Sequence, residues 1–528
     1  MLSLNSSRAA MRFSLLLALV AMFALLTSAA FAQTTISTGS IVGTVTDASG
    51  AVVQGAKVTI TGPTGQLLSA TSNAQGGYSV GDLIPGVYKV RIEAKGFKTT
   101  QMPLEVRVNN TANGNAKLEV GQESTVVDVQ ASEVQVNTEQ ATVQGVLTSS
   151  QIENLPVNGR NFLDLAQLEP GVQIQDGTNF DPTKVGFSSI SFGGRFGRTA
   201  RINVDGIDVS DETVGTTTED IPASGIQEFS LAQSTLDLSN DLTSSGAVNV
   251  TTKSGTNTLH GEAFGQFRDS SVGSAKLVEP WDTSTLSFIP APFQRNQEGG
   301  NLGGPIIKDK LFFFVDGERT LQHLAAPIAE SAPYDSYSGT FPAPFKENEL
   351  MARVDYALTK SARMFGRFNY FDNSVFATFF PSSFQVYNNK DYTRNTVLGL
   401  DFNTGSITHS IRFSYLKFQN QIIDGTRGTD LPFANYPVSI NIGSFSVGPN
   451  LLAPQQTPQS DHELKYDGTK VIGKHVLRFG VSWNHIQGGG FASFFKIDPQ
   501  VFVGPGPNGD PTSASLGNGE VIVGNGQG

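Results

Sequence analysis

The sequence has 528 residues, including 56 glycines and no cysteine, and its formal net charge is −11. The lack of cysteine excludes disulfides, thiolate metal sites and a cysteine nucleophile, and the acidic balance argues against a nucleic-acid partner. A hydrophobic content of only 38% favours β-structure with one polar face over a thick helical core.

The first 32 residues have the pattern of a secretory signal peptide. Arg8 and Arg12 precede an apolar run at 13–26, and small residues lead up to Ala32. A basic flank, a short apolar run and an Ala-x-Ala ending are typical of signal peptides. The run is shorter than the roughly 20 residues that a membrane-spanning helix needs. We therefore predict export and cleavage after Ala32.

Residues 40–119 are predicted to form a β-sandwich of the immunoglobulin or transthyretin kind. Short β-branched strands at 41–46, 56–60 and 88–92 alternate with Gly and Pro turns. The runs GTVTD, GAKV, GYS and LIPG make this segment resemble the carboxypeptidase regulatory-like domain. The resemblance implies a fold and not an activity, since such domains are non-catalytic appendages.

Residues 120–144 are predicted to be a linker with one β-prone stretch. This stretch consists of Thr125, Val126, Val127, Asp128 and Val129. Such a stretch can add as a strand to a sheet edge of another protein. The alternative is an edge strand of the next domain, and the sequence does not decide between them.

The segment 145–255 carries four motifs in a fixed order: LPVNGRNFLDL, INVDGIDV, IQEF and SGAVNVTTKSGTN. Together they resemble the plug domain of TonB-dependent outer-membrane transporters, which implies a small α+β domain. A capped helical turn is expected at 149–155 and a turn with positive φ at Gly206. The motif residues singled out are Asn158, Gly159, Arg160, Arg195, Arg201, Asp205, Gly206, Gly246, Lys253 and Gly255.

One position departs from the resembling family. Its members commonly carry an Arg just before the Ser-Gly pair, where this chain has Ser244 before 245–246. If that Arg attaches plug to barrel in relatives, Arg195, Arg198 or Arg201 must replace it here. The alternative is that this plug is held in a different way.

Residues 256–528 show long stretches of alternating apolar and polar side chains, as at 352–358, 364–370 and 477–483. Short turns and long loops between them favour the first strands of an antiparallel transmembrane β-barrel over a soluble sheet. The run 295–314 resembles the barrel start of the Oar-like subgroup, and its phenylalanines 312–314 are expected at the membrane interface. Nine or ten strands fall short of the roughly 22 of a plugged transporter. We therefore expect an N-terminal fragment of a longer protein.

No catalytic, cofactor or metal site is predicted. The six histidines lack metal-ligand spacing, and the Gly-rich runs lack the Lys-Ser/Thr of a phosphate loop. Asp205 and Asp208 form a carboxylate pair, which we interpret as loop hydrogen bonding rather than acid–base chemistry.

The leading functional hypothesis is energy-coupled uptake through a plugged barrel in the outer membrane of a Gram-negative cell, with the N-terminal domains in the periplasm. The resemblance implies TonB and its inner-membrane energising complex, outer-membrane lipid and an unidentified extracellular ligand as partners. Two alternatives are a secreted surface adhesin with short, even strands and a carbohydrate-binding scaffold. The scaffold would use as stacking platforms Tyr78, Trp281 and Trp483.

Overall fold

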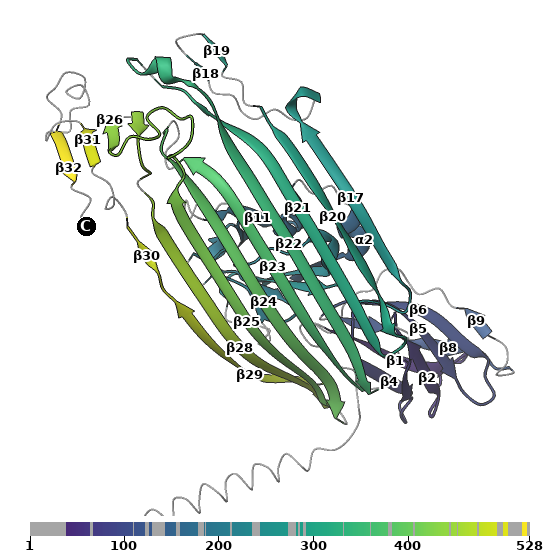
Figure 1. The fold of residues 1–528 in the computed structure, drawn as a ribbon. Coiled ribbons are helices and arrows are strands. Elements are labelled where there is room, and N and C mark those ends of the chain that lie inside the picture. The colour runs from purple at the N-terminus through teal and green to yellow at the C-terminus, as the bar shows by residue number, and fades with distance from the viewer. Residues whose placement is uncertain are drawn as a thin grey trace, which may run out of the picture.

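The computed structural model shows a β-sandwich, a compact plug and a long tilted sheet (Figure 1). The described residues run from 38 to 504 and from 520 to 524. Within these ranges the gaps are 64–66, 109, 122–125, 129–142, 155–158, 178–183, 185, 212–213, 235–242, 273–280, 283–285, 289–291, 331, 360, 379–382, 405–406, 443–444, 451, 473–474 and 494–499. The predicted signal peptide therefore lies outside the described residues.

The sandwich consists of two sheets. The first has the order β4-β1-β7, and β8 also pairs with β1. The second has the order β3-β2-β5-β6-β9. Alternate residues of these strands enclose a core that includes Val58, Tyr88 and Ile92. Tyr78 is part of this core and donates a hydrogen bond to the Gly114 carbonyl, which contradicts its proposed role as a sugar-stacking platform. The strands are β1 (Gly39–Asp47), β2 (Lys57–Thr61), β3 (Leu67–Thr71), β4 (Gly77–Leu83), β5 (Gly86–Glu93), β6 (Thr99–Val106), β7 (Thr111–Asn113), β8 (Ala116–Leu118) and β9 (Val126–Asp128).

The β-prone stretch of the linker belongs to the sandwich. β9 pairs in parallel with β6, from Thr99 opposite Val126 to Gln101 opposite Asp128. The expectation of an edge strand in the following domain is therefore wrong, because these residues extend the preceding sheet. Thr125 and Val129 lie outside the described residues.

The plug is a five-stranded sheet of order β10-β15-β16-β13-β14 with short helical turns around it. The predicted helical turn is confirmed as α2, which ends just before the undescribed residues 155–158. The elements are β10 (Val143–Thr148), α2 (Ser149–Asn154), η1 (Phe162–Leu168), β11 (Val172–Asp176), β12 (Ser188–Phe192), η3 (Gly197–Thr199), β13 (Arg201–Val204), β14 (Ile207–Asp208), η4 (Ala223–Gly225), β15 (Ile226–Ser234) and β16 (Ala247–Thr252).

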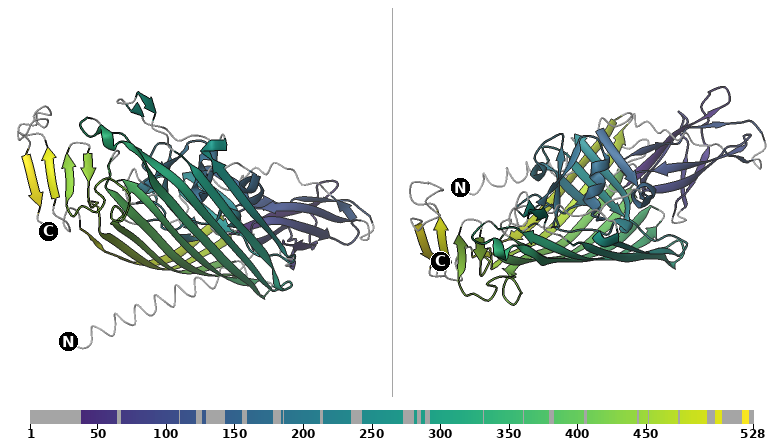
Figure 2. Two further views of the ribbon diagram at one scale, coloured as in Figure 1. Left: turned by 45° about the horizontal axis from the view of Figure 1, so that its top comes forward. Right: turned by 90° about the horizontal axis from the view of Figure 1, so that it is seen from above.

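The third part is a ten-stranded antiparallel sheet, called the wall below, which curves around one side of the plug (Figure 2). Its order is β17-β20-β21-β22-β23-β24-β25-β28-β29, and β30 pairs with β28. The strands are β17 (His260–Asp269), β20 (Gln294–Ile307), β21 (Leu311–Ile328), β22 (Gly339–Thr359), β23 (Ala362–Thr378), β24 (Val386–Thr404), β25 (Ile407–Asp424), β28 (Gln455–Ile472), β29 (His475–Gly488) and β30 (Phe491–Ala492).

Side chains alternate across the wall as the sequence predicts. Val354 and Leu398 are exposed on the outer face, whereas Arg353 and Arg367 are buried toward the plug. Trp483 is also exposed, at 56%. Eight strands of the wall have 14 to 21 residues, which contradicts the short strands expected of an adhesin.

The expectation for phenylalanines 312–314 is wrong in two of three positions. Phe312 and Phe314 are buried on the inner face, and Phe314 joins the hydrophobic core of the plug. The period of two along β21 turns only Phe313 outward. Among the described residues, no helix is both long and apolar enough to cross a membrane.

The wall has short turns at one end and long loops at the other. The sandwich lies at the short-turn end (Figure 1). The long loops carry η5 (Ser270–Val272), η6 (Asp335–Tyr337) and a β18–β19 hairpin (Trp281–Asp282 and Ser287–Phe288). A separate four-stranded sheet contains β26 (Ser439–Ile442), β27 (Phe445–Val447), β31 (Gln500–Gly504) and β32 (Glu520–Gly524). The last described strands thus lie in this separate sheet and not in the wall.

Candidate functional site: the seam between plug and wall

The seam, meaning the contacts between plug and wall, centres on the tip of the β13–β14 hairpin. Asp205 and Gly206 form the two-residue turn with φ values of 52° and 88°. Two positive φ values in succession suit a tight hairpin, and Gly206 adopts its value without a Cβ clash. The predicted turn is therefore confirmed. The turn directs the Asp205 carboxylate into the wall.

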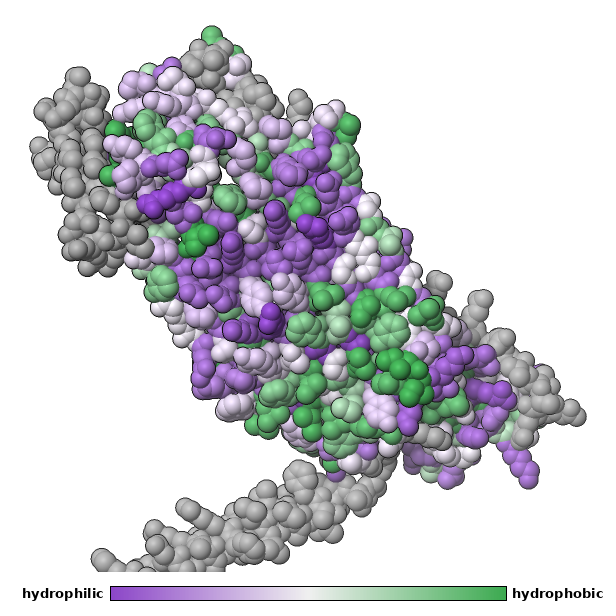
Figure 3. Space-filling view, in the orientation of Figure 1, coloured by the Kyte–Doolittle hydropathy of each residue, from purple (hydrophilic) through white to green (hydrophobic). Residues whose placement is uncertain are grey.

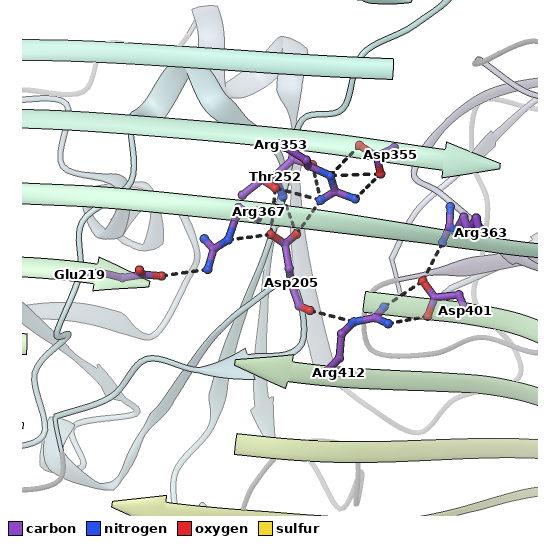
Figure 4. A network of polar contacts seen from close by, with 9 residues as sticks. All are labelled: Asp205, Glu219, Thr252, Arg353, Asp355, Arg363, Arg367, Asp401 and Arg412. Atoms are coloured by element: carbon purple, nitrogen blue, oxygen red, sulfur yellow. Dashed lines mark hydrogen bonds and ion pairs between the residues drawn. The ribbon is translucent and has the colours of Figure 1, made fainter. Parts of the chain in front are cut away.

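Two wall arginines receive this carboxylate. Arg353 on β22 and Arg367 on β23 are directly opposite each other, and both are buried. Like charges in directly opposite positions destabilise a sheet unless an anion lies between them. Asp205 supplies that anion, with Oδ1 at 3.1 Å from Nη1 of Arg353 and Oδ2 at 3.3 Å from Nε of Arg367 (Figure 4).

Hydrogen bonds from the plug hold the Asp205 carboxylate in place. The backbone N–H of Thr252 donates to Oδ1 at 3.0 Å, and its hydroxyl donates to Oδ2 at 2.9 Å. Thr252 is the last residue of β16, so two plug strands fix one side chain. The acceptor is thus oriented before it meets the wall, which makes its hydrogen bonds with charged partners specific.

The ionic network extends to both sides of Asp205 (Figure 4). On one side, Arg367 also pairs with Glu219 of the plug at 3.2 Å. On the other, Arg412 donates from Nε to the Asp205 carbonyl at 3.1 Å and pairs with Asp401 at 2.7 Å. Such buried charges are tolerable only because each has an opposite partner.

A second ionic contact lies on strand β21. Arg160 donates from Nε and Nη2 to the two carboxylate oxygens of Glu318, at 2.9 and 2.7 Å. Its guanidinium also lies 4.1 Å from the ring centroid of Phe264. Phe264 is an apolar residue among the polar inward positions of β17, and the Arg160 cation of the plug covers its ring.

Part of the seam is apolar. Phe187 of the plug packs against Phe371 and Phe418 of the wall, with ring centroids 5.5 and 6.0 Å apart. The hydrophobic core of the plug therefore continues into the wall, where it also includes Phe314 and Met351.

The glycine motifs of the plug allow close backbone approach. A Cβ at Gly255 would lie 2.3 Å from the Phe313 carbonyl oxygen, and one at Gly246 would lie 2.6 Å from the Ala232 carbonyl oxygen. Gly159, with φ at 91°, accepts a hydrogen bond from Nε2 of Gln297 through its carbonyl. Gly159 and Gly255 therefore fix where the plug meets the wall.

A cavity of about 350 Å³ separates sandwich, plug and wall at the short-turn end. Asp205, Arg353 and Asp401 line it on one side. Glu228 lines the other, and both of its carboxylate oxygens accept from the Val108 N–H of the sandwich, at 2.8 and 2.9 Å. Burial raises the pKa of Glu228 to about 8, and the hydrogen bond from Val108 opposes this shift.

The structure brings only some of the motif residues to the wall. Gly159, Arg160, Asp205 and Gly255 contact it, whereas Asn158 lies outside the described residues. The other contacts lie within the plug: Arg195 donates to the Ser244 carbonyl at 2.8 Å, Arg201 pairs with Asp208 at 3.1 Å, and Lys253 pairs with Glu153 at 2.6 Å.

The contacts of Asp205 agree with the second of the two expected arrangements, in which the plug is held in a different way. Arg195 does not replace the missing arginine, because it donates to the Ser244 carbonyl within the plug; instead, two wall arginines contact a plug carboxylate. The roles of four residues were not predicted from the sequence: Arg353, Arg367, Arg412 and Glu219. The signal that could have revealed the wall arginines is a charged residue at an inward position of a long strand. Among the described residues, no group of three or more His, Asp or Glu could hold a metal ion.

Comparisons with known proteins identify the family. Residues 251–335 and 320–514 match the outer membrane beta barrel domain, and together these ranges span half of the 528 residues. The chain belongs to the outer membrane β-barrel family. This membership places the protein in the outer membrane of a Gram-negative cell. Residues 40–119 match the carboxypeptidase regulatory-like domain.

Relatives of this β-barrel chain are larger proteins. The TonB-dependent transporter Oar of Myxococcus xanthus is 28% identical over 302 residues, which cover 54% of this chain and 27% of Oar. The outer membrane transporter YddB of Escherichia coli has the same fold, with a TM-score of 0.52 at 11% identity over 70% of this chain and 50% of YddB. The siderophore receptor PirA of Acinetobacter baumannii gives a TM-score of 0.47 at 16% identity, over 74% of this chain and 54% of PirA. The chain thus spans about a quarter of Oar and half of YddB.

Proposed function

We propose that this β-barrel chain is part of a TonB-dependent outer-membrane transporter that imports an extracellular ligand through a plugged pore. The observation that carries the proposal is the ionic seam, in which a plug carboxylate lies between two wall arginines. Such a contact holds a separately folded domain inside a barrel and can be broken without unfolding either part. The similarity to Oar supports the same function. We propose no enzymatic activity.

In this mechanism, movement of the plug is the step that opens the pore. The plug has its own hydrophobic core, which includes Phe162, Phe229 and Val250. Its contacts with the wall combine the aromatic packing of Phe187 on Phe371 and Phe418 with ion pairs and hydrogen bonds, and the polar contacts weaken when water enters. Pulling on the plug therefore separates it from the wall at the seam before its core unfolds.

We propose β9 as the strand that TonB contacts. It lies at the edge of its five-stranded sheet, and among the described strands it pairs with β6 alone. An edge strand offers unpaired N–H and C=O groups to a further strand.

The experiment uses single-cysteine variants, since these 528 residues contain no natural cysteine. Val127→Cys in the full-length protein is expected to form a disulfide with a TonB that carries cysteines along its own C-terminal strand. Ser69→Cys is the matched control, because it lies on β3, the opposite edge of the same sheet. Equal cross-linking of the two variants, or none at 127, would overturn the assignment of β9. Recovery of the protein in the soluble fraction would overturn transport itself.

A further inference from the structure

The outer face of the wall is divided into two zones. Hydrophobic residues gather near the short-turn end, and hydrophilic residues cover the part nearer the long loops (Figure 3). On β24, the outward positions 398, 400 and 402 are Leu, Leu and Phe, whereas 390, 392 and 394 are Lys, Tyr and Arg. The apolar band of an outer-membrane barrel is about 25 Å tall and is bordered by aromatic girdles. The change from Leu398 to Arg394 therefore marks the extracellular border of that band.

Cations are concentrated at this border. Arg394 is directly opposite Lys417 of β25, and both are exposed. Two outward-facing rows closer to the loops, Lys390 and Lys346 lie on the two sides of Ser374. These four residues, called the basic cluster, come from three strands of the wall.

Among the described residues, the basic cluster has fewer neighbouring anions than cations. None of its four members forms an ion pair with a described residue, and Arg394 instead covers the ring of Tyr392 at 4.9 Å. Asp372 lies between the two rows, where Nδ2 of Asn348 donates to it at 3.1 Å. One carboxylate against four cations leaves an excess of positive charge. Like charges at directly opposite positions, as at Arg394 and Lys417, destabilise a sheet on their own.

We propose that the basic cluster binds the phosphate groups of a phosphorylated glycolipid headgroup in the outer leaflet. A guanidinium and several ammonium groups suit phosphate oxygens. The lipid is favoured over free phosphate because the cluster directly borders the exposed apolar residues Leu398 and Phe413, which can hold acyl chains of the same molecule. The proposal rests on the outer-membrane placement of the proposed function.

The test compares lipid binding to full-length protein extracted from outer membranes in a mild neutral detergent. Native mass spectrometry measures retention of added lipid A with two phosphates and of the same lipid after dephosphorylation. The variant is Arg394→Gln with Lys417→Gln. The control removes two cations from the β20–β21 turn at the opposite end of the wall, by Lys308→Gln with Lys310→Gln.

The wild-type protein and the control are expected to prefer the phosphorylated lipid. At about 5-fold per surface cation, the double variant should lose roughly 30-fold in affinity for that lipid and keep its affinity for the dephosphorylated one. Its thermal unfolding midpoint without lipid should equal or exceed the wild-type value, because a repulsion is removed. That readout separates lost binding from lost folding.

Three results would overturn the proposal: equal binding of both lipids by the wild type, an equal loss in the control variant, or full competition by millimolar inorganic phosphate. Each of these leaves the proposed transport function intact, because the protein would still fractionate with the outer membrane. Recovery in the soluble fraction would instead remove both.

Discussion

Neutralising Asp205 is the most direct test of the seam. Asp205→Asn keeps the size of the side chain, and Asn tolerates the positive φ of this position. It removes the charge that Arg353 and Arg367 share at 3.1 and 3.3 Å. Breaking a buried ion pair costs about 3–5 kcal/mol. The lower end applies here, since Arg353 keeps Asp355 at 2.9 Å and Arg367 keeps its pair with Glu219.

A loss of about 3 kcal/mol corresponds to a roughly 150-fold larger population with the hairpin released from the wall. Hydrogen–deuterium exchange of the full-length protein in native outer-membrane vesicles measures this population, because exchange reports local opening. Peptides covering the β13–β14 hairpin should exchange faster by that factor, while sandwich peptides should not change. Glu153→Gln is the control, because it removes an ion pair within the plug.

Adding Arg353→Gln to the Asp205 variant should have little further effect, because the two residues act as a pair. If the hairpin of Asp205→Asn exchanges at a rate within about threefold of the wild-type rate, the reasoning is refuted, because loss of a buried ion pair should destabilise the contact by more than that. Equal acceleration in Glu153→Gln would refute it too.

Two further predictions concern the junctions at either end of the plug. The folded pKa of Glu228, about 8, exceeds the unfolded value of 4.5, so docking of the sandwich is strongest below pH 4.5 and weakens as the pH rises through 8. The urea midpoint of the wild type should therefore be higher at about pH 6 than at about pH 9, and the two midpoints should converge in Glu228→Gln. Equal midpoints in the wild type would contradict the assignment. Gly255→Ala places a Cβ 2.3 Å from a backbone oxygen and should destabilise the protein by about 1–3 kcal/mol. Gly265→Ala, with open space around it, should leave the thermal midpoint unchanged, and equal midpoints for both variants would disprove the close approach.

The sequence allowed the three-part β architecture to be predicted because its signals are local. Alternation along single strands reveals the wall, and the turn at Gly206 follows from the residue itself. The mainly β fold class is confirmed by the structure and by the match to the outer membrane beta barrel domain.

The seam could not be predicted in the same way, because it depends on register between distant segments. Asp205 and Arg367 are 162 positions apart, and only the pairing of β22 with β23 places Arg353 beside Arg367. The parallel pairing of β9 with β6 is also non-local, and the linker sequence gave no sign of which sheet it would join. For Phe312 and Phe314 the error was local: the run of phenylalanines suggested the membrane interface, whereas alternation along β21 places these two on the inner face.

The short pairing between β9 and β6 has a mechanical consequence. Only three residue pairs join the two strands. If force is applied at β9, these few pairs would be among the first contacts to break, and β9 would separate from β6 while the rest of the sandwich stays folded. The chain that follows β9 leads to the first strand of the plug, so the same tension would act on the seam.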